Sequence, residues 1–445
     1  MAANGFKAAG VFCDIKRLGT GKGSEKGRKR DLALVVSDRP AAVAGMFTTN
    51  QICAAPVKLC MQRMKQRSAQ AIVINSGNAN ACTGKHGMKD AAAMARFTET
   101  ALALKPGSAL VGSTGRIGVN LPMDNVRAGI IEAAVELGAS TKHATHAAEA
   151  IMTSDTRLKQ VAVEFDLGGV PVRIGGMCKG AGMIQPGMSP TGARPAASPL
   201  HATMLCFLTT DAAIEAGALQ TALSHAVAAS FNRITVDGDM STNDTVLVLA
   251  NGLASRAPAD PSSKSKGPPS LPVINNRKSD QFRAFQHALS HVCLELAKMI
   301  VRDGEGVSRF VTIRLGGARS FQDADAAARS IANSALVKTS WHGGDPNWGR
   351  IIDALGYSSA CIVEEKVDIG YSRPGSSKVL WSLKRGQPTK AGFPALCAAV
   401  APKEFDLHIN LNLGGSSALM YAADLTEAYV EFNKGDVTDP GSLGG

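Results

Sequence analysis

The stretch QPGMSPTGARPAASPLHATMLCFLTTDA, residues 185–212, joins two kinds of sequence that seldom adjoin. Residues 185–202 contain four prolines and many small residues, which is typical of an irregular, exposed segment. Residues 203–212 are apolar and typical of a buried strand. The junction between residues 202 and 203 is therefore unusual, and the fold is best analysed outward from the strand that begins there.

Strand-like and helix-like segments alternate along most of the chain. The strand-like segments are apolar and rich in β-branched residues, and they lie at 31–38, 71–77, 108–115, 161–176, 244–252, 309–317, 360–371 and 405–415. The helix-like segments repeat apolar residues at helical spacing, at 89–104, 123–137, 280–303 and 323–338. This alternation predicts an α/β protein of layered sheets and helices. Residues 255–272, rich in Pro, Ser and Lys, predict a flexible surface loop.

The composition is that of an ordinary globular protein in a reducing compartment. The 445 residues carry a formal net charge of +11, part of which is local to the loop-like KGSEKGRKR at 22–30. No aromatic residues are interleaved there, so no nucleic-acid partner is expected. The nine cysteines form no CxxC pair, which indicates free thiols and a cytoplasmic protein. We also expect no membrane span, no signal peptide, no metal and no resident cofactor.

Thr203, at the junction, has the chemistry of a nucleophile that chain cleavage would create. Inside a chain, the threonine hydroxyl is a poor nucleophile with no base beside it in the sequence. If the Ala202–Thr203 bond is cut, Thr203 gains a free α-amine with a pKa of about 8, which accepts the hydroxyl proton. The small Ala202 leaves room for the hydroxyl to attack the preceding carbonyl. Taken alone, however, an Ala-Thr dipeptide is better explained as the start of a strand.

Motifs along nearly the whole chain favour the interpretation of Thr203 as a nucleophile. In chain order these motifs are INSGNANACTG (74–84), GSTGRIG (112–118), AIMTSDT (150–156), MCKGAGMIQP (177–186), HATMLCFLTTDA (201–212), VDGDMSTNDT (236–245), IVRDGEG (300–306) and DPNWGRI (345–351). In residues and order these motifs resemble the ornithine acetyltransferase family, the bifunctional glutamate N-acetyltransferases of arginine biosynthesis. The resemblance implies an acyltransferase whose layered α/β fold is related in arrangement to N-terminal-nucleophile hydrolases.

The resemblance also implies self-cleavage at Ala202–Thr203. Residues 1–202 would form an α fragment ending in the extended loop 185–202, and residues 203–445 a β fragment, with both retained in an (αβ)2 or larger assembly. Thr203 would take the acetyl group of N-acetyl-L-ornithine and pass it to L-glutamate. Some members of the family also use acetyl-CoA as donor, and the sequence leaves its use here open.

Site residues follow from the same motifs. The resemblance implies that Thr114 and Gly115 form an oxyanion hole, where one donor is worth roughly 3 kcal/mol. It assigns substrate binding to six residues, Thr153, Lys179, Thr203, Glu305, Asn433 and Thr438. Lys179 suits a substrate carboxylate and Glu305 a substrate ammonium.

Three features depart from the family pattern. Additional residues lie between Pro186 and Thr203, which lengthens the end of the first fragment. Met240 stands where the family usually has a small hydroxyl residue, and the chain continues through DPGSLGG after Thr438, where the family usually ends. Thr191, inside the lengthened segment, is a weaker candidate for the cleavage point because no strand follows it.

Other features of the sequence are compatible with different sites or functions. His287 and His291 have metal-ligand spacing on a predicted helix but lack the HExxH glutamate, so surface histidines are favoured. Cys206 lies three residues after Thr203 on the same strand, so alternation turns it away from Thr203 and into the core. Two other functions stay open. One is a self-cleaving amidase or aminopeptidase, in which water discharges the acyl-enzyme, and the other is an uncut homologue with a binding role.

Overall fold

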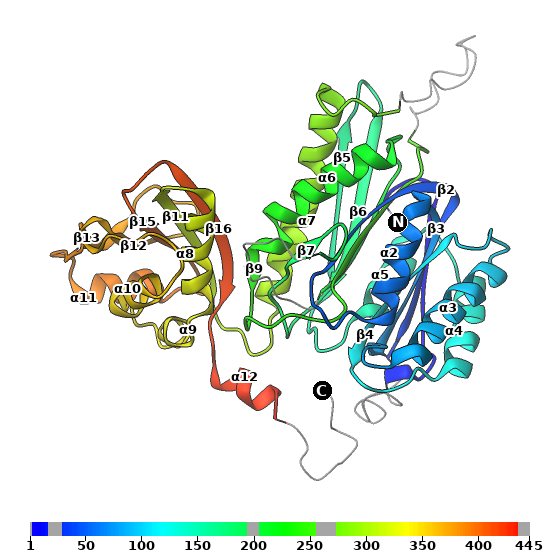
Figure 1. The fold of residues 1–445 in the computed structure, drawn as a ribbon, viewed down its shortest axis with the longest axis horizontal. Helices are drawn as coiled ribbons and strands as arrows, with labels where there is room; N and C mark the ends of the chain where they lie inside the picture. The colour runs from blue at the N-terminus through cyan, green and yellow to red at the C-terminus, as the bar shows by residue number, and fades with distance from the viewer. Residues whose placement is uncertain (1, 17–28, 194–203, 255–272, 435–445) are drawn as a thin grey trace.

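The computed structural model describes residues 2–16, 29–193, 204–254 and 273–434. Two β-sheets with helices packed against them make up this part of the chain, which confirms the predicted α/β class (Figure 1). No helix in these ranges is long and apolar enough to cross a membrane. The cleavage residues Ala202 and Thr203, the substrate-binding candidate Thr438 and the predicted loop 255–272 lie outside the described residues.

The first sheet has nine strands within the described ranges, and its main path runs β4-β3-β2-β10-β8-β6-β5. The strands are β1 (Phe6–Val11), β2 (Leu32–Thr48), β3 (Ser68–Asn78), β4 (Ala109–Arg116), β5 (Lys159–Asp166), β6 (Pro171–Lys179), β7 (Met188–Ser189), β8 (Leu205–Thr210) and β10 (Thr245–Ala250). β8 and β10, which follow residue 203, pair between β2 and β6, which precede it. Two fragments cut at residue 203 would therefore be held together by backbone ladders.

Two hydrophobic cores cover this sheet. One packs against α2 (Ala55–Arg63), α3 (Gly84–Ala101), α4 (Met123–Val135) and α5 (Thr141–Ile151), and the other against α6 (Ala216–Ala229) and α7 (Asp280–Arg302). Figure 1 shows the two groups of helices on different sides of the sheet. The side chains of β8 alternate between the cores, because Leu205 and Phe207 belong to the first while Cys206 and Leu208 belong to the second. The prediction that Cys206 is a core residue is confirmed.

The Phe207 side chain connects β8 to β4 through the first core. Its ring lies over Gly112, where an added Cβ would come within 2.8 Å of the ring. A glycine at this position therefore leaves room for the Phe207 side chain, which reaches β4 although three strands lie between β8 and β4 in the sheet.

A second sheet of seven strands in the described residues runs β14-β13-β12-β15-β11-β16-β9. Its strands are β9 (Ile234–Thr235), β11 (Phe310–Ala318), β12 (Asp368–Ser372), β13 (Leu380–Lys384), β14 (Gln387–Pro388), β15 (Glu404–Asn410) and β16 (Ser416–Ala423). A third core joins it to α8 (Phe321–Asn333), α9 (Ala335–His342), α10 (Trp348–Gly356) and α11 (Phe393–Val400). Phe310 and Tyr421 from this sheet enter the second core, so the two sheets are packed together through α7. Short 3-10 turns lie at Met64–Gln66, Phe231–Arg233 and Glu364–Lys366.

The beginning of the segment predicted to be irregular is packed into the protein. Residues 184–188 are buried, and β7 pairs with the end of β2. The side chain of Asn232 accepts a hydrogen bond from the Met188 N–H (3.0 Å) and donates one to its carbonyl (3.1 Å). The prediction of an exposed loop from residue 185 is therefore wrong for these first residues, because Met188 contributes its apolar side chain to the second core.

The two helix histidines and the nine cysteines agree with the predictions made for them. His287 and His291 both lie on the exposed side of α7. All nine cysteines lie in the described ranges and are free thiols, as predicted.

Candidate active site

The last residues of β4 include the two residues predicted to form the oxyanion hole, which pair with Ser76 and Gly77 of β3. Thr114 is buried, whereas Gly115 is exposed. Gly115 has a φ of +127°, and an added Cβ would lie 2.3 Å from the carbonyl carbon of Gly77 on β3. Only glycine fits this close crossing of two backbones.

The segment 236–245 connects the end of β4 to the start of β8. The Asn243 side chain donates hydrogen bonds from Nδ2 to the carbonyls of Ser113 (2.8 Å) and Ala79 (2.7 Å). The next residue, Asp244, accepts a hydrogen bond on Oδ1 from the Met204 N–H (2.5 Å). Asn243 therefore binds Ser113, the residue before Thr114, and Asp244 binds Met204, the residue after Thr203.

Asp244 carries an unusual carboxyl group. The side chain is fully buried, and its Oδ2 has no hydrogen-bond partner within the described part of the chain. Burial raises the pKa of this carboxyl well above its usual value, although the Met204 N–H and the charge of Lys179 oppose the rise. A buried oxygen without a partner is rare in proteins and calls for an explanation.

Lys179, the last residue of β6, lies beside the start of β8. It pairs with Leu205 of β8 in the sheet and is only 3% exposed. Burial lowers the pKa of Lys179 below its usual value, although the charges of Asp155 and Glu305 oppose the fall. The Lys179 side chain is thus a buried amine placed among carboxyl groups, next to the first strand after the junction.

Asp155 joins the segments that carry Thr153 and Lys179. Its carboxylate accepts hydrogen bonds from the backbone N–H groups of Thr153 (3.0 Å) and Gly180 (2.7 Å) and from the Lys159 ammonium (2.6 Å). Burial opposes ionisation, but the charges of Lys179 and Lys159 and these hydrogen bonds lower the pKa of Asp155 to about 2. Asp155 is therefore ionised at neutral pH and fixes the backbone around both candidate residues.

Lys159 links Asp155 to a second buried carboxylate, Asp303, with which it also forms an ion pair. Burial disfavours its charge, but the two carboxylates outweigh burial and raise the pKa of Lys159. Asp303 also accepts hydrogen bonds from Thr156 and from the Arg157 N–H (3.2 Å). One buried cation thus ties the AIMTSDT segment to the IVRDGEG segment.

Replacing Lys159 by methionine is expected to destabilise the protein by about 3–5 kcal/mol, because two carboxylates remain buried without their cation. Urea unfolding of the Lys159→Met variant measures this loss. A Thr203→Ala background removes the predicted cleavage, so that unfolding involves a single chain. Lys7→Met is the matched control, because Lys7 and Asp38 pair at 3.0 Å on the surface, and it should cost less than about 1 kcal/mol. Equal losses in the two variants would contradict this account of the buried cluster.

Glu305 lies on the loop after α7, near Lys179 of β6. Its backbone N–H donates to the Ala181 carbonyl (2.9 Å), and an added Cβ at Gly182 would lie within 2.3–2.5 Å of its carboxylate. The Asn433 side chain donates from Nδ2 to Glu305 Oε2 (3.0 Å). An exposed amide and a half-buried carboxylate therefore meet near the buried amine of Lys179.

Hydrogen bonds and sheet pairing of neighbouring residues link the six described candidates indirectly. These are Thr114, Gly115, Thr153, Lys179, Glu305 and Asn433, whose functional roles remain predictions. Asp155, Asn243, Asp244 and Asp303 were not singled out from the sequence, although each lies inside a quoted motif. Lys159 lies outside every motif, and no local signal indicated it. Met240 contributes its backbone carbonyl, which accepts a hydrogen bond from Asn50 (3.4 Å).

Comparison with known proteins agrees with this arrangement of motifs. The sequence model of the ArgJ family matches residues 7–436. The "Arginine biosynthesis bifunctional protein ArgJ" of Symbiobacterium thermophilum is 45% identical over 97% of this chain and 96% of its own. The protein of the same name from Geobacter sulfurreducens is 40% identical over 97% of this chain and 99% of its own.

One solved structure of similar sequence is the ornithine acetyltransferase of Mycobacterium tuberculosis complexed with ornithine. It is 39% identical, with a TM-score of 0.38, and the match covers 42% of this chain and 94% of that one. The family match spans nearly the whole chain, and the two relatives named above are covered almost completely. On this evidence the chain belongs to the ArgJ family.

Proposed function

We propose that this protein cuts itself between Ala202 and Thr203 and then transfers the acetyl group of N-acetyl-L-ornithine to L-glutamate through an acetyl-Thr203 intermediate. Membership of the ArgJ family and the names of its relatives, which are bifunctional proteins of arginine biosynthesis, support an acyltransferase of that pathway. The observation that carries the proposal is the pairing of Lys179 with Leu205 at the start of β8, with Glu305 near Lys179 and with Asn243 and Asp244 linking the end of β4 to Met204.

The charges suit amino-acid substrates. Lys179 pairs with a substrate carboxylate, and Glu305, held by Asn433, pairs with a substrate ammonium. A pair of opposite charges near one nucleophile orients both N-acetylornithine and glutamate, since each has a carboxylate and an amine. A simple amidase has no need of this second recognition element, because water is its acceptor.

Self-cleavage begins when the Thr203 hydroxyl attacks the Ala202 carbonyl carbon. The carbon–nitrogen bond breaks, the hydroxyl proton passes to the Thr203 nitrogen, and water then hydrolyses the resulting ester. We assign the proton transfer to Asp244, because this buried carboxyl holds the next N–H along the chain and its Oδ2 has no partner in the described residues.

Acetyl transfer follows with the new α-amine of Thr203 as the base. The hydroxyl attacks the acetyl carbonyl, Thr114 and Gly115 stabilise the oxyanion, and ornithine leaves with a proton. Glutamate then attacks the acetyl-threonine ester and regenerates the hydroxyl. Leu205 and Phe207, two and four residues after Thr203, face the core that contains the β4 strand, which is consistent with attack on that side.

An exchange assay tests this function. Purified protein with N-acetylornithine, labelled in its acetyl group, and glutamate should give labelled N-acetylglutamate with ping-pong kinetics and without coenzyme A. The proposal includes no resident cofactor, so extensive dialysis should leave the rate unchanged. Labelled acetate as the main product would favour the amidase reading instead. Parallel assays with acetyl-CoA and a solution mass measurement test donor use and the (αβ)2 or larger assembly.

A further inference from the structure

The helix that carries Asn433 to Glu305 has little of its own to hold it in place. α12 (Glu427–Phe432) has six residues, and none of them is buried. A helix this short is unstable in isolation, so its position must depend on contacts with neighbouring elements. Asn433 is the residue that ends it, and the Asn433 amide reaches Glu305 only while α12 stays in place.

The first turn of α12 is attached to the loop that contains Glu305. Thr426 donates from Oγ1 to the Gly306 carbonyl (2.7 Å) and accepts a hydrogen bond from the Tyr429 N–H (3.0 Å). Gly306 has a φ of +67°, and an added Cβ would lie 2.3 Å from the Tyr429 nitrogen. The glycine of this loop therefore lets the helix sit directly against it.

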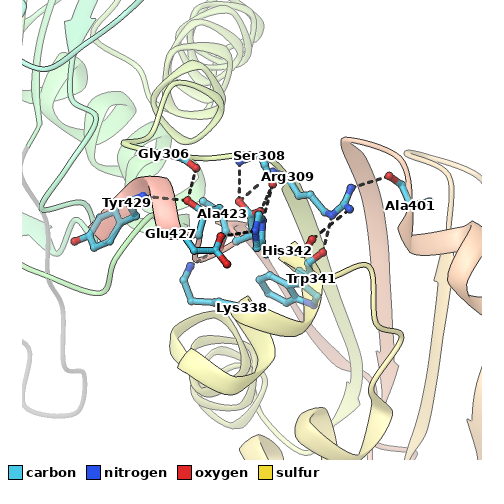
Figure 2. Close-up of polar contacts among 12 residues, drawn as sticks. Gly306, Ser308, Arg309, Lys338, Trp341, His342, Ala401, Ala423, Glu427 and Tyr429 are labelled. Carbon is cyan, nitrogen blue, oxygen red and sulfur yellow. Dashed lines mark hydrogen bonds and ion pairs between the residues drawn. The ribbon is translucent and has the colours of Figure 1, made fainter. Parts of the chain in front are cut away.

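His342, at the end of α9, connects α12 to the second sheet (Figure 2). Its Nε2 lies 2.9 Å from the Glu427 carboxylate, and its Nδ1 lies 3.2 Å from the Ser308 hydroxyl and 3.4 Å from the Asp424 carboxylate, just after β16. Asp424 is buried and is fixed in turn by the N–H groups of Ser308 and Arg309, at 3.0 Å each, and by the Ser308 hydroxyl. The imidazole thus joins a fixed carboxylate on the sheet to an exposed carboxylate on the helix.

The surroundings support this attachment. Hydrogen bonds from its own backbone and from His342 lower the pKa of Glu427, so this carboxylate is charged. Lys338, one turn earlier on α9, donates to the Ala423 carbonyl, and burial lowers the pKa of Lys338 to about 8. The Tyr429 hydroxyl adds a long contact of 3.4 Å to Asp237 on the other side of the helix.

We propose that His342 is a positioning residue for substrate binding: by joining Asp424 to Glu427 it holds α12 so that Asn433 stays on Glu305. His342 itself touches neither the substrate nor the reacting atoms. This inference rests on the proposed function of Glu305 in holding a substrate ammonium. It predicts that losing the imidazole weakens substrate binding and leaves the chemical step intact.

The test is a double-mutant cycle with steady-state kinetics. His342→Ala is expected to raise KM for N-acetylornithine about 5- to 10-fold with kcat within about twofold, the sign of lost binding. Asn433→Ala should have a similar effect. The double variant should be no worse than Asn433→Ala alone, because His342 acts through Asn433. Glu427→Gln, at an exposed position, should reproduce His342→Ala if that variant folds poorly.

His408→Ala is the matched control. His408 is a half-buried histidine on β15 whose Nε2 lies 2.8 Å from the Ser372 hydroxyl, away from α12. Its loss should leave both constants unchanged. Any of three results would overturn the inference. The increases in KM from the two substitutions could multiply in the double variant, or KM could stay unchanged in both His342→Ala and Glu427→Gln. The third such result is an increase in KM in His408→Ala equal to that in His342→Ala.

Hydrogen exchange separates this inference from the proposed function. Backbone amides of α12 should exchange faster in His342→Ala than in the wild type, whatever the enzyme catalyses. If the wild type does not transfer acetyl groups, the proposed function fails, and the exchange rates still decide the role of His342. Unchanged exchange in α12 would overturn the positioning role even in a fully active enzyme.

Discussion

The Thr203→Ala variant is expected to remain one uncut chain of 46.1 kDa for these 445 residues, whereas the wild type separates into two fragments on denaturation. One wild-type fragment should begin with TMLCFLTTDA. Alanine removes the hydroxyl that attacks the Ala202 carbonyl, so neither the cut nor the free α-amine forms. Acetyl transfer should fall by at least about 10⁴-fold, since the loss of a catalytic nucleophile costs this much or more. Intact mass, N-terminal sequencing and the exchange assay measure the three effects.

Thr203→Ser is the control for this experiment. Serine keeps the hydroxyl and, once cut, the α-amine, so this variant should be cleaved and should retain part of the activity. A wild-type protein that stays intact would contradict self-cleavage and favour an uncut homologue with a binding role. A new N-terminus at another residue, such as Thr191, would reassign the nucleophile.

The Asp244→Asn variant is expected to fold normally but to mature at least about 100-fold more slowly, the scale of general acid–base catalysis. The amide keeps an oxygen that accepts the Met204 N–H, so the geometry at the start of β8 is preserved. It cannot carry a proton from the Thr203 hydroxyl to the Thr203 nitrogen. The fraction of intact chain, followed by mass spectrometry after expression and during incubation, measures the rate.

Asp211→Asn is the matched control, because Asp211 is a buried carboxylate at the other end of β8. It accepts hydrogen bonds from the N–H groups of Arg173 (2.8 Å) and Asn4 (3.0 Å), and burial raises its pKa as well. This variant should mature at the wild-type rate. Normal maturation of Asp244→Asn, or equal slowing in both variants, would remove Asp244 from the proton-transfer step.

Local patterns predicted many elements closely. The predicted strand 71–77 lies inside β3, 108–115 nearly matches β4, and the predicted helix 280–303 corresponds to α7. α7 is well defined because Ser279 caps its first turn through the Phe282 N–H (3.1 Å) and its apolar face is continuous. Such signals act within one element and can be read from a few neighbouring residues.

Other predicted elements differ from the structure at positions where the backbone conformation interrupts the apolar pattern. The predicted strand 161–176 is two strands, β5 and β6, because Gly168 and Gly169, both with positive φ, turn the chain between them. The predicted helix 323–338 breaks at Ser334, which caps a new helix, α9. Only the end of the predicted strand 360–371 forms β12, since exposed charged residues at 364–366 form a 3-10 turn instead.

The sequence by itself determined the α/β class, the order of the motifs and the family, because these depend on local patterns and on residues that can be compared one by one. Only the tertiary structure decided that β8 lies inside the sheet, that Asp244 holds the Met204 N–H and that Lys159 joins Asp155 to Asp303. The partners in these ion pairs and hydrogen bonds are separated by up to 144 positions along the chain. Burial and pairing at such distances arise from packing of whole elements, and no local pattern encodes them.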